Sequence, residues 1–141
     1  MKKVMLIGQT GAGKAALIHA LSEDGYAARK AMAVDYCGPF INTPGEFLEN
    51  RRFYFALITT SADCDMLFMV QSATHSTSLF PPQFATIFNR TVLGVVSHAD
   101  APDANVERAR RYLQSAGARS VICIDAATGK GLDEVRALIG S

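Results

Sequence analysis

The chain has 141 residues, of which 49% are hydrophobic and 19% are charged, and its formal net charge is +1. This composition is typical of a folded globular protein and excludes an intrinsically disordered chain. A net charge near zero offers no general attraction to nucleic acid, and no apolar run approaches the roughly 18 residues of a membrane-spanning helix. We therefore expect one domain over residues 1–141, with neither a nucleic-acid nor a membrane partner.

The cysteines and the first residues bear on the location of the protein. Cys37, Cys64 and Cys123 are far apart and lack the spacing of a disulfide framework or a zinc site. The first three residues lead directly into an apolar run, without the long apolar core of a signal peptide. Both features predict a protein of the reducing cytoplasm, in which Cys123 would be a core thiol.

Short apolar runs alternate along the chain with segments of helical periodicity. Strands are predicted at residues 4–7, 40–41, 66–70, 92–96 (interrupted by Gly94) and 121–124, with a candidate edge strand at 33–36. Helices are predicted at residues 14–22, 50–60 (burying Tyr54, Leu57 and Ile58), 103–116 and 132–139. Strands that are apolar on both faces favour a mostly parallel sheet between two helical layers, a three-layer α/β/α fold. A ligand of such a sheet binds beyond the carboxyl ends of the strands.

The first predicted strand leads into the loop Gly8-Gln9-Thr10-Gly11-Ala12-Gly13-Lys14-Ala15, at the start of a helix. This order and spacing are those of a phosphate-binding loop, G-x-x-x-x-G-K-[ST], with Ala15 in the last position. Backbone N–H groups and the helix N-terminus attract phosphate oxygens there, and Lys14 reaches the β- and γ-phosphates. The hydroxyl missing at position 15 normally holds Mg²⁺. A glycine-rich turn that binds nothing is the alternative interpretation.

A second candidate segment, Asn42-Thr43-Pro44-Gly45-Glu46, follows the strand predicted at 40–41. GTPases of the Ras-like class place D-x-x-G here, where the aspartate binds Mg²⁺ through water and the glycine N–H meets the γ-phosphate. Asn42 replaces the aspartate, and a neutral amide is a poor ligand for a hard cation. Gly45 remains. An ordinary Thr-Pro-Gly turn is the alternative interpretation.

Two later loops have the pattern of a guanine site. Ser97-His98-Ala99-Asp100 is similar to [NT]-K-x-D, whose aspartate accepts hydrogen bonds from guanine N1 and N2, and His98 replaces the lysine that packs over the base. The run from Asp125 to Glu134 looks like S-A-x-x-G-x-G-L-D-E-L of bacterial GTPases, with Asp125 in the serine position. Ala126 would present its N–H to guanine O6. A helix N-cap at Asp100 and a plain turn after Asp125 are the alternatives.

Taken with these motifs, the chain resembles the EutP/PduV family of small P-loop proteins, encoded with bacterial microcompartments that degrade ethanolamine or propanediol. The resemblance also runs through residues 28–33, 43–47 and 54–60. It implies a minimal Ras-like GTPase fold and a bound nucleotide, GTP or GDP by motif and ATP as the alternative. It further implies a role in amine or diol catabolism, with microcompartment shell or enzyme proteins as partners.

The departures from the family pattern affect the positions that would bind Mg²⁺ and the γ-phosphate. Ala15, Ala31 and Asn42 stand where the resemblance implies ligands on the Mg²⁺ and γ-phosphate side, so no metal site is expected and Mg²⁺ should bind weakly or not at all. Phosphoryl transfer depends on such charge neutralisation. We therefore predict a hydrolysis-deficient, nucleotide-binding scaffold or interaction protein. An active GTPase or ATPase, with Glu46 orienting water, and a small-molecule kinase are the alternatives.

The candidate nucleotide-binding residues lie in the four motif loops. They are Gly8, Gly11, Ala12, Gly13, Lys14, Ala15, Gly45, His98, Asp100, Asp125 and Ala126.

Overall fold

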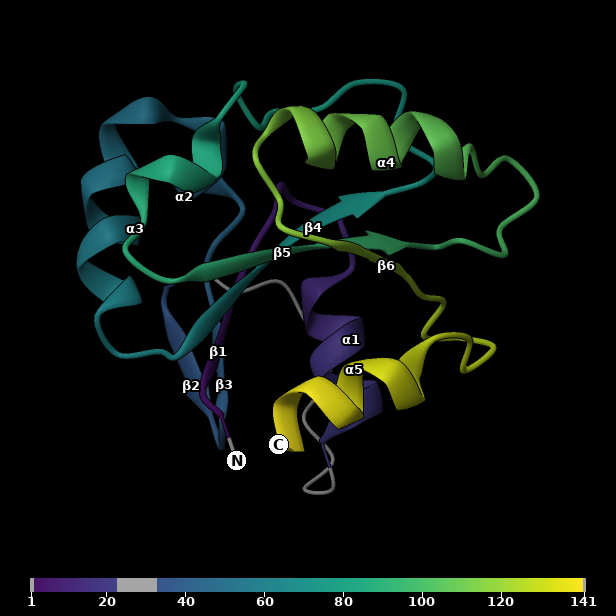
Figure 1. The fold of residues 1–141 in the computed structure, drawn as a ribbon, viewed down its shortest axis with the longest axis horizontal. Coiled ribbons are helices and arrows are strands. Elements are labelled where there is room, and N and C mark those ends of the chain that lie inside the picture. The colour runs from purple at the N-terminus through teal and green to yellow at the C-terminus, as the bar shows by residue number, and fades with distance from the viewer. Residues whose placement is uncertain (1, 23–32, 141) are drawn as a thin grey trace.

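The computed structural model describes residues 2–22 and 33–140 and contains a six-stranded sheet of order β2-β3-β1-β4-β5-β6 (Figure 1). The strands are β1 (Val4–Ile7), β2 (Asp35–Cys37), β3 (Phe40–Asn42), β4 (Met66–Ser72), β5 (Thr91–Ser97) and β6 (Val121–Cys123). All neighbouring strands run parallel except β2, which pairs antiparallel with β3 at the edge. The predicted mostly parallel sheet is therefore confirmed.

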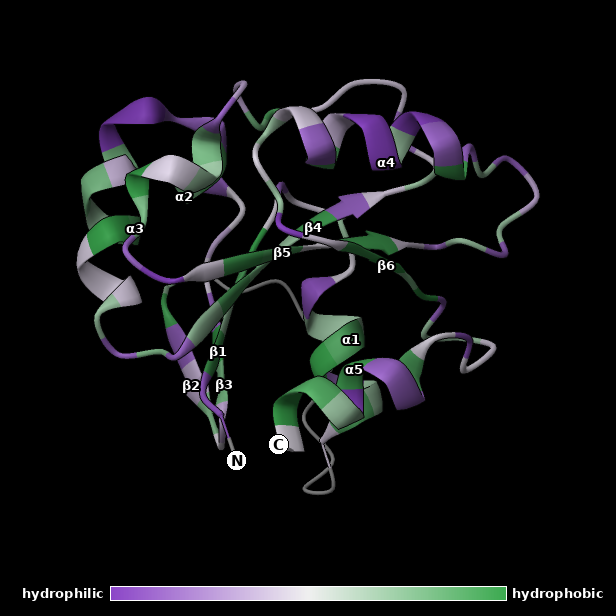
Figure 2. Ribbon diagram, in the orientation of Figure 1, coloured by the Kyte–Doolittle hydropathy of each residue, from purple (hydrophilic) through white to green (hydrophobic). Residues whose placement is uncertain are grey.

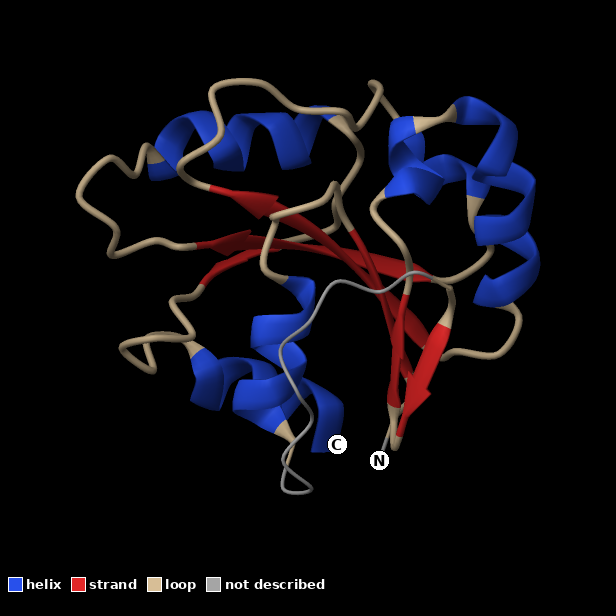
Figure 3. Cartoon of the chain, turned by 180° about the vertical axis from the view of Figure 1, so that it is seen from behind, coloured by secondary structure: helices blue, strands red, loops and turns tan. Residues whose placement is uncertain are grey.

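Helices cover both faces of the sheet. They are α1 (Lys14–Leu21), α2 (Glu46–Glu49), α3 (Tyr54–Ser61), α4 (Val106–Ser115) and α5 (Leu132–Gly140), with the 3₁₀ turns η1 (Arg51–Phe53) and η2 (Phe84–Ile87). Figures 1 and 3 show α2, α3 and α4 on one face, and α1 and α5 on the other. This arrangement is the predicted three-layer α/β/α fold. Within the described residues, no helix is long and apolar enough to cross a membrane.

The alternation of side chains along each strand explains the two hydrophobic clusters. Met5 and Ile7 of β1 enter the cluster under α2, α3 and α4, whereas Val4 and Leu6 enter the one under α1 and α5. All seven residues of β4 are buried, as expected for a central strand with helices on both sides. Figure 2 shows these central strands in hydrophobic colours and much of α4 in hydrophilic ones.

Several details differ from the sequence-based expectations. Gly94 does not interrupt β5; a Cβ there would lie 3.0 Å from Leu113 Cδ1 on α4, so glycine allows close helix–sheet packing. Ile58 is 37% exposed, whereas Leu57, the residue before it on α3, is fully buried. Cys64, rather than the half-buried Cys123, is the buried thiol.

The start of α4 also differs from the prediction, since the helix begins at Val106 rather than at residue 103. The Asn105 side chain accepts a hydrogen bond from the Arg108 N–H at 3.1 Å, which is an N-cap.

Candidate phosphate-binding and nucleotide-binding site

The loop between β1 and α1 has a conformation that requires its glycines. Gly11 and Gly13 have φ values of 85° and 99°, in the left-handed region that other residues rarely adopt. A Cβ on Gly8 would lie 2.7 Å from the Val70 carbonyl of β4. The backbone therefore turns tightly between β1 and the N-terminus of α1.

Several amides of this loop are available to an anion. Among the described residues, no acceptor is recorded for the N–H groups of Gly11, Gly13 and Lys14. The last two lie at the start of α1, where helix geometry leaves amides without partners and the helix dipole is positive. Such a helix terminus suits a phosphate or carboxylate.

Lys14 is folded back into the loop. Its ammonium donates hydrogen bonds to the carbonyls of Gly8 at 2.6 Å and Gln9 at 3.2 Å, and the residue is 7% exposed. Burial lowers the pKa of Lys14 from 10.5 to about 8, against the raising effect of the Glu49 carboxylate. The site thus contains a cation that an anionic ligand would stabilise.

The segment after β3 closes over the outer turn of the loop. Gly45 packs so tightly that a Cβ there would clash with the Thr10 backbone nitrogen. One turn further along α2, the Glu49 carboxylate accepts a hydrogen bond from the Thr10 N–H at 2.8 Å. Glu46 is exposed, and no hydrogen bond joins its side chain to any described residue. The helix therefore brings Glu49, and not Glu46, to the loop.

His98 lies between β4 and the phosphate loop. Its Nδ1 shares a hydrogen bond with the Ser72 hydroxyl at 2.7 Å, and its ring lies 3.4 Å from where a Cβ on Gly13 would be. Its backbone has a positive φ of 56°. The preceding residue, Ser97, donates from its hydroxyl to the Ala12 carbonyl. The end of β5 is therefore attached to the phosphate loop by two consecutive residues.

The two candidate base-binding loops are joined through Asp100 and Asp125. The carboxylate of Asp125 accepts hydrogen bonds from the backbone N–H groups of Asp100, Ala127 and Thr128. Burial opposes its ionisation, yet these three donors hold the pKa of Asp125 below its usual range. The Asp125 carboxylate thus stabilises the conformation of both loops. The next residue, Ala126, is half-buried.

Asp100 is more open than Asp125. Its carboxylate accepts a hydrogen bond from the Thr128 hydroxyl at 2.7 Å and lies 3.5 Å from the Lys130 ammonium. Its side chain is 36% exposed. A guanine donor would have to compete with these two partners.

Comparison with known proteins gives the family. The family model PduV-EutP, described as ethanolamine utilisation – propanediol utilisation, matches residues 1–141. The chain belongs to the PduV-EutP family. The resemblance found in the sequence is thereby confirmed.

Three relatives illustrate how similar this PduV-EutP chain is to known members. The "Propanediol utilization protein PduV" of Citrobacter freundii is 35% identical over 136 residues, covering 96% of this chain and 91% of that protein. The "Probable acetate kinase EutP" of Escherichia coli K12 is 39% identical over 119 residues, covering 83% and 75%. The "Probable acetate kinase EutP" of Salmonella typhimurium LT2 is 38% identical over 124 residues, covering 86% and 78%.

The residues at the metal positions do not fit Mg²⁺ in this PduV-EutP member. Ala15 offers a methyl group at the start of α1, and Asn42, 1% exposed, offers a neutral amide at the end of β3. Ala31 lies outside the described residues. The described chain holds no cluster of three or more histidine, cysteine or acidic residues suited to a metal.

The candidate residues from the four motif loops meet at the carboxyl ends of β1, β3, β5 and β6. Sequence reasoning missed Glu49, Ser72 and Thr128. For Glu49 a signal was present, because it lies four residues after Gly45 and a helix beginning there places both on one face.

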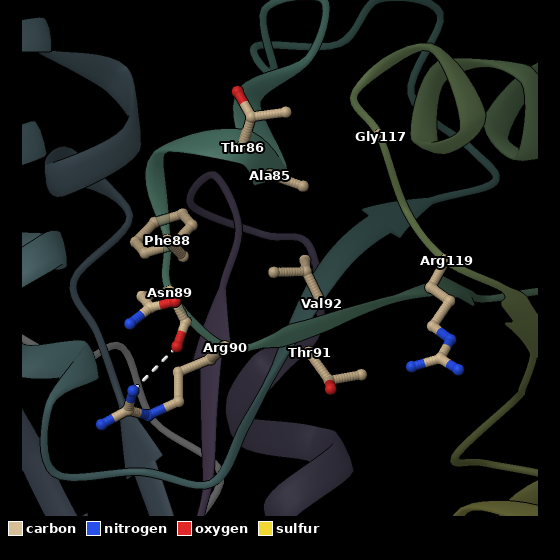
Figure 4. Close-up of a pocket in the computed structure, with 9 residues that line it drawn as sticks. All are labelled: Ala85, Thr86, Phe88, Asn89, Arg90, Thr91, Val92, Gly117 and Arg119. Atoms are coloured by element: carbon tan, nitrogen blue, oxygen red, sulfur yellow. Dashed lines mark hydrogen bonds between the residues drawn. The ribbon is translucent and has the colours of Figure 1, made fainter.

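A separate cleft of about 430 Å³ lies at the opposite end of β5 (Figure 4). Arg90 and Arg119 line it from different sides. Arg90 is engaged with the backbone, donating to the carbonyls of Cys64 at 2.8 Å and Asn89 at 2.7 Å. This cleft is remote from the motif loops, and we assign the candidate site to those loops.

Proposed function

We propose that this PduV-EutP member binds a nucleotide, with its phosphates in the loop 8–15 and its base against the loops after β5 and β6. The observation that carries the proposal is the set of loop amides that have no acceptor among the described residues, beside the buried ammonium of Lys14. Each of these groups gains from an anionic acceptor, and a diphosphate offers several oxygens at once.

We infer a preference for guanine from Asp100. A carboxylate accepts from both N1–H and N2–H of guanine, whereas adenine offers no matching pair of donors. A site built on such hydrogen bonds can discriminate by a factor on the order of 10⁴. Competition from Thr128 and Lys130 and the exposure of Asp100 should reduce that factor here.

The biological role that we propose follows from the family. The relatives are named for propanediol utilization and as probable acetate kinases, and the family is described by ethanolamine and propanediol utilisation. With Ala15 and Asn42 at the metal positions, we propose weak or absent Mg²⁺ dependence and negligible hydrolysis. The protein would then act as a nucleotide-binding scaffold, with shell or enzyme proteins of a microcompartment as partners.

Calorimetric titration with GDP, GTP and ATP, with Mg²⁺ and with a chelator, tests the binding proposal. Guanine nucleotides should bind more tightly than ATP, and Lys14→Ala should lose most of the affinity. Lys3→Ala is the matched control, because Lys3 is exposed and precedes β1, at the opposite end of that strand from the loop. Equal affinity for ATP and GTP would remove the guanine preference, and no binding at millimolar ligand would remove the function.

Restoring two metal positions tests the proposed loss of Mg²⁺. The double variant Ala15→Thr/Asn42→Asp returns a hydroxyl and a carboxylate to the places where Mg²⁺ is normally held. We expect Mg²⁺ to strengthen nucleotide binding at least about fivefold in this variant and to change wild-type binding little. Robust Mg²⁺-dependent phosphate release by the wild type, lost in Lys14→Ala, would contradict the hydrolysis-deficient role.

A phosphotransferase is the second candidate, because two relatives are named as probable acetate kinases. It would require this chain to transfer a phosphoryl group from a nucleotide to acetate. Incubation with ATP or GTP, acetate and Mg²⁺, followed by trapping acetyl phosphate as the hydroxamate, tests it. Product that disappears in Lys14→Ala would favour the kinase over the scaffold.

A further inference from the structure

Two residues of one helical turn reach the same point of the phosphate loop. Gly45 lies against Thr10, and the Glu49 carboxylate accepts the Thr10 N–H at 2.8 Å. The Glu49 amide in turn donates to the Gly45 carbonyl at 3.1 Å, so the turn that presents both residues is hydrogen-bonded. The contact is therefore held by the backbone of α2 and does not depend on a flexible side chain alone.

The Glu49 carboxylate already acts as an anion toward this loop. It accepts a backbone N–H, as a phosphate oxygen would, and its charge acts on the ammonium of Lys14. The amides of Gly11, Gly13 and Lys14 have no recorded acceptor among the described residues. One end of the loop thus holds a built-in anion, whereas the amides at the other end suit an anionic ligand.

The strand order indicates which end of a nucleotide this carboxylate faces. The candidate base loops follow β5 and β6, the phosphate loop follows β1, and the segment with Glu49 follows β3. In the sheet, β3 and β5 lie on opposite sides of β1 and β4. A nucleotide whose base lies by β5 and β6 therefore extends its phosphate chain toward β3, and its last phosphate approaches Glu49.

We propose that Glu49 occupies the place where a third phosphate would meet the loop, so that the site takes nucleoside diphosphates in preference to triphosphates. This inference rests on the proposed nucleotide-binding function and specifies its ligand. A diphosphate uses the amides at the start of α1 and leaves the contact between Thr10 and Glu49 in place. A triphosphate must displace a carboxylate and bring further negative charge beside it.

Calorimetry with GDP and GTP in the presence of a chelator tests the inference on the wild type, Glu49→Gln and Glu49→Ala. Glutamine keeps the shape of the side chain and an acceptor oxygen but removes its charge. We expect the wild type to bind GDP more tightly than GTP, and Glu49→Gln to tighten GTP binding by about tenfold while changing GDP binding by less than about threefold. Glu49→Ala should act in the same direction.

Glu134→Gln is the matched control, since this exposed glutamate lies on α5 and makes the same change of charge away from Thr10. It should leave the ratio of the two dissociation constants unchanged. Binding of both nucleotides with the same ratio in the wild type and Glu49→Gln would overturn this inference and leave the proposed function intact. Absence of GDP and GTP binding in every variant would overturn both. Circular dichroism on each variant establishes that it is folded.

Discussion

The side chain of Lys14 is buried in the phosphate loop, where its ammonium donates a hydrogen bond to the Gly8 carbonyl. The pKa of this group falls from 10.5 to about 8 because burial disfavours the charged form. At neutral pH the folded chain therefore bears the cost of holding a buried cation in readiness for an anion. Such costs are typical of binding sites, where stability is given up for function.

Replacing Lys14 with methionine should stabilise the ligand-free protein at pH 7. The pKa difference sets an upper limit of about 3 kcal/mol, and lost hydrogen bonds to Gly8 and Gln9 reduce the expected gain to about 1–2 kcal/mol. From pH 8 to 10.5 the unfolded lysine binds more protons than the folded one, so wild-type stability gains relative to the variant. Urea unfolding of both proteins at pH 7 and pH 9.5 measures the difference. The prediction would be contradicted if the two proteins had the same unfolding free energy at pH 7, or if the difference between them did not become smaller at pH 9.5.

At the scale of elements, the absence of a side chain at Gly94 allows α4 to pack closely against β5. The strand is central, with six of its seven residues buried, and α4 lies across it through Leu113. Gly94 leaves room for that leucine, and Ala118 after the helix fills the remaining space. The helix can then bury Ala109 and Leu113, while Glu107 and Arg111 on the same helix are exposed.

Gly94→Ala should push α4 away from the sheet. The added Cβ would lie 3.0 Å from Leu113 Cδ1 and 3.2 Å from Ala118 Cβ, which is closer than carbon atoms normally pack. Overpacking of this kind costs about 1–3 kcal/mol of unfolding free energy. Chemical denaturation measures it, with Gly140→Ala as the control, since a Cβ there meets nothing within 4 Å. A neutral or stabilising Gly94→Ala would show that α4 moves freely to accommodate it.

For the whole molecule, the sheet is shared by two hydrophobic clusters, one under each helical layer. Each central strand contributes alternate residues to both clusters, so neither layer can separate without exposing the other face of the same strands. The four motif loops extend from the edge of this shared sheet. The site should therefore have the stability of the complete fold and not that of one layer.

We predict that residues 1–141 unfold as one cooperative unit. Leu17→Ala on the α1 side and Leu113→Ala on the α4 side each remove a fully buried side chain. Each should lower the unfolding free energy by about 2–5 kcal/mol without splitting the transition. Far-UV and near-UV circular dichroism followed during denaturation check this, with the 40% exposed Leu79→Ala as the mild control. Two separate transitions in either core variant would show that the layers fold independently.

Local patterns in the sequence were sufficient to predict most helices and strands and the loops that form the candidate site. The short apolar run Val4–Ile7, followed by a glycine-rich turn, favours a buried strand. The glycine and lysine spacing of residues 8–14 predicts the backbone conformation of the loop. The family followed from the same motifs. Those predictions depend on neighbours in the chain, whose geometry is limited by the backbone itself.

The partners of the site residues were decided only by the tertiary structure. Glu49 meets Thr10 from 39 residues away, Ser72 meets His98 from 26, and Asp125 meets the Asp100 amide from 25. These contacts exist because strands that are distant in sequence end side by side at one edge of the sheet. The sequence determined which groups this protein carries to that edge. Only the packing of Gly45 against Thr10 decided which face of α2 meets the phosphate loop. A helical turn of 3.6 residues then aligns Glu49, and not Glu46, with that contact.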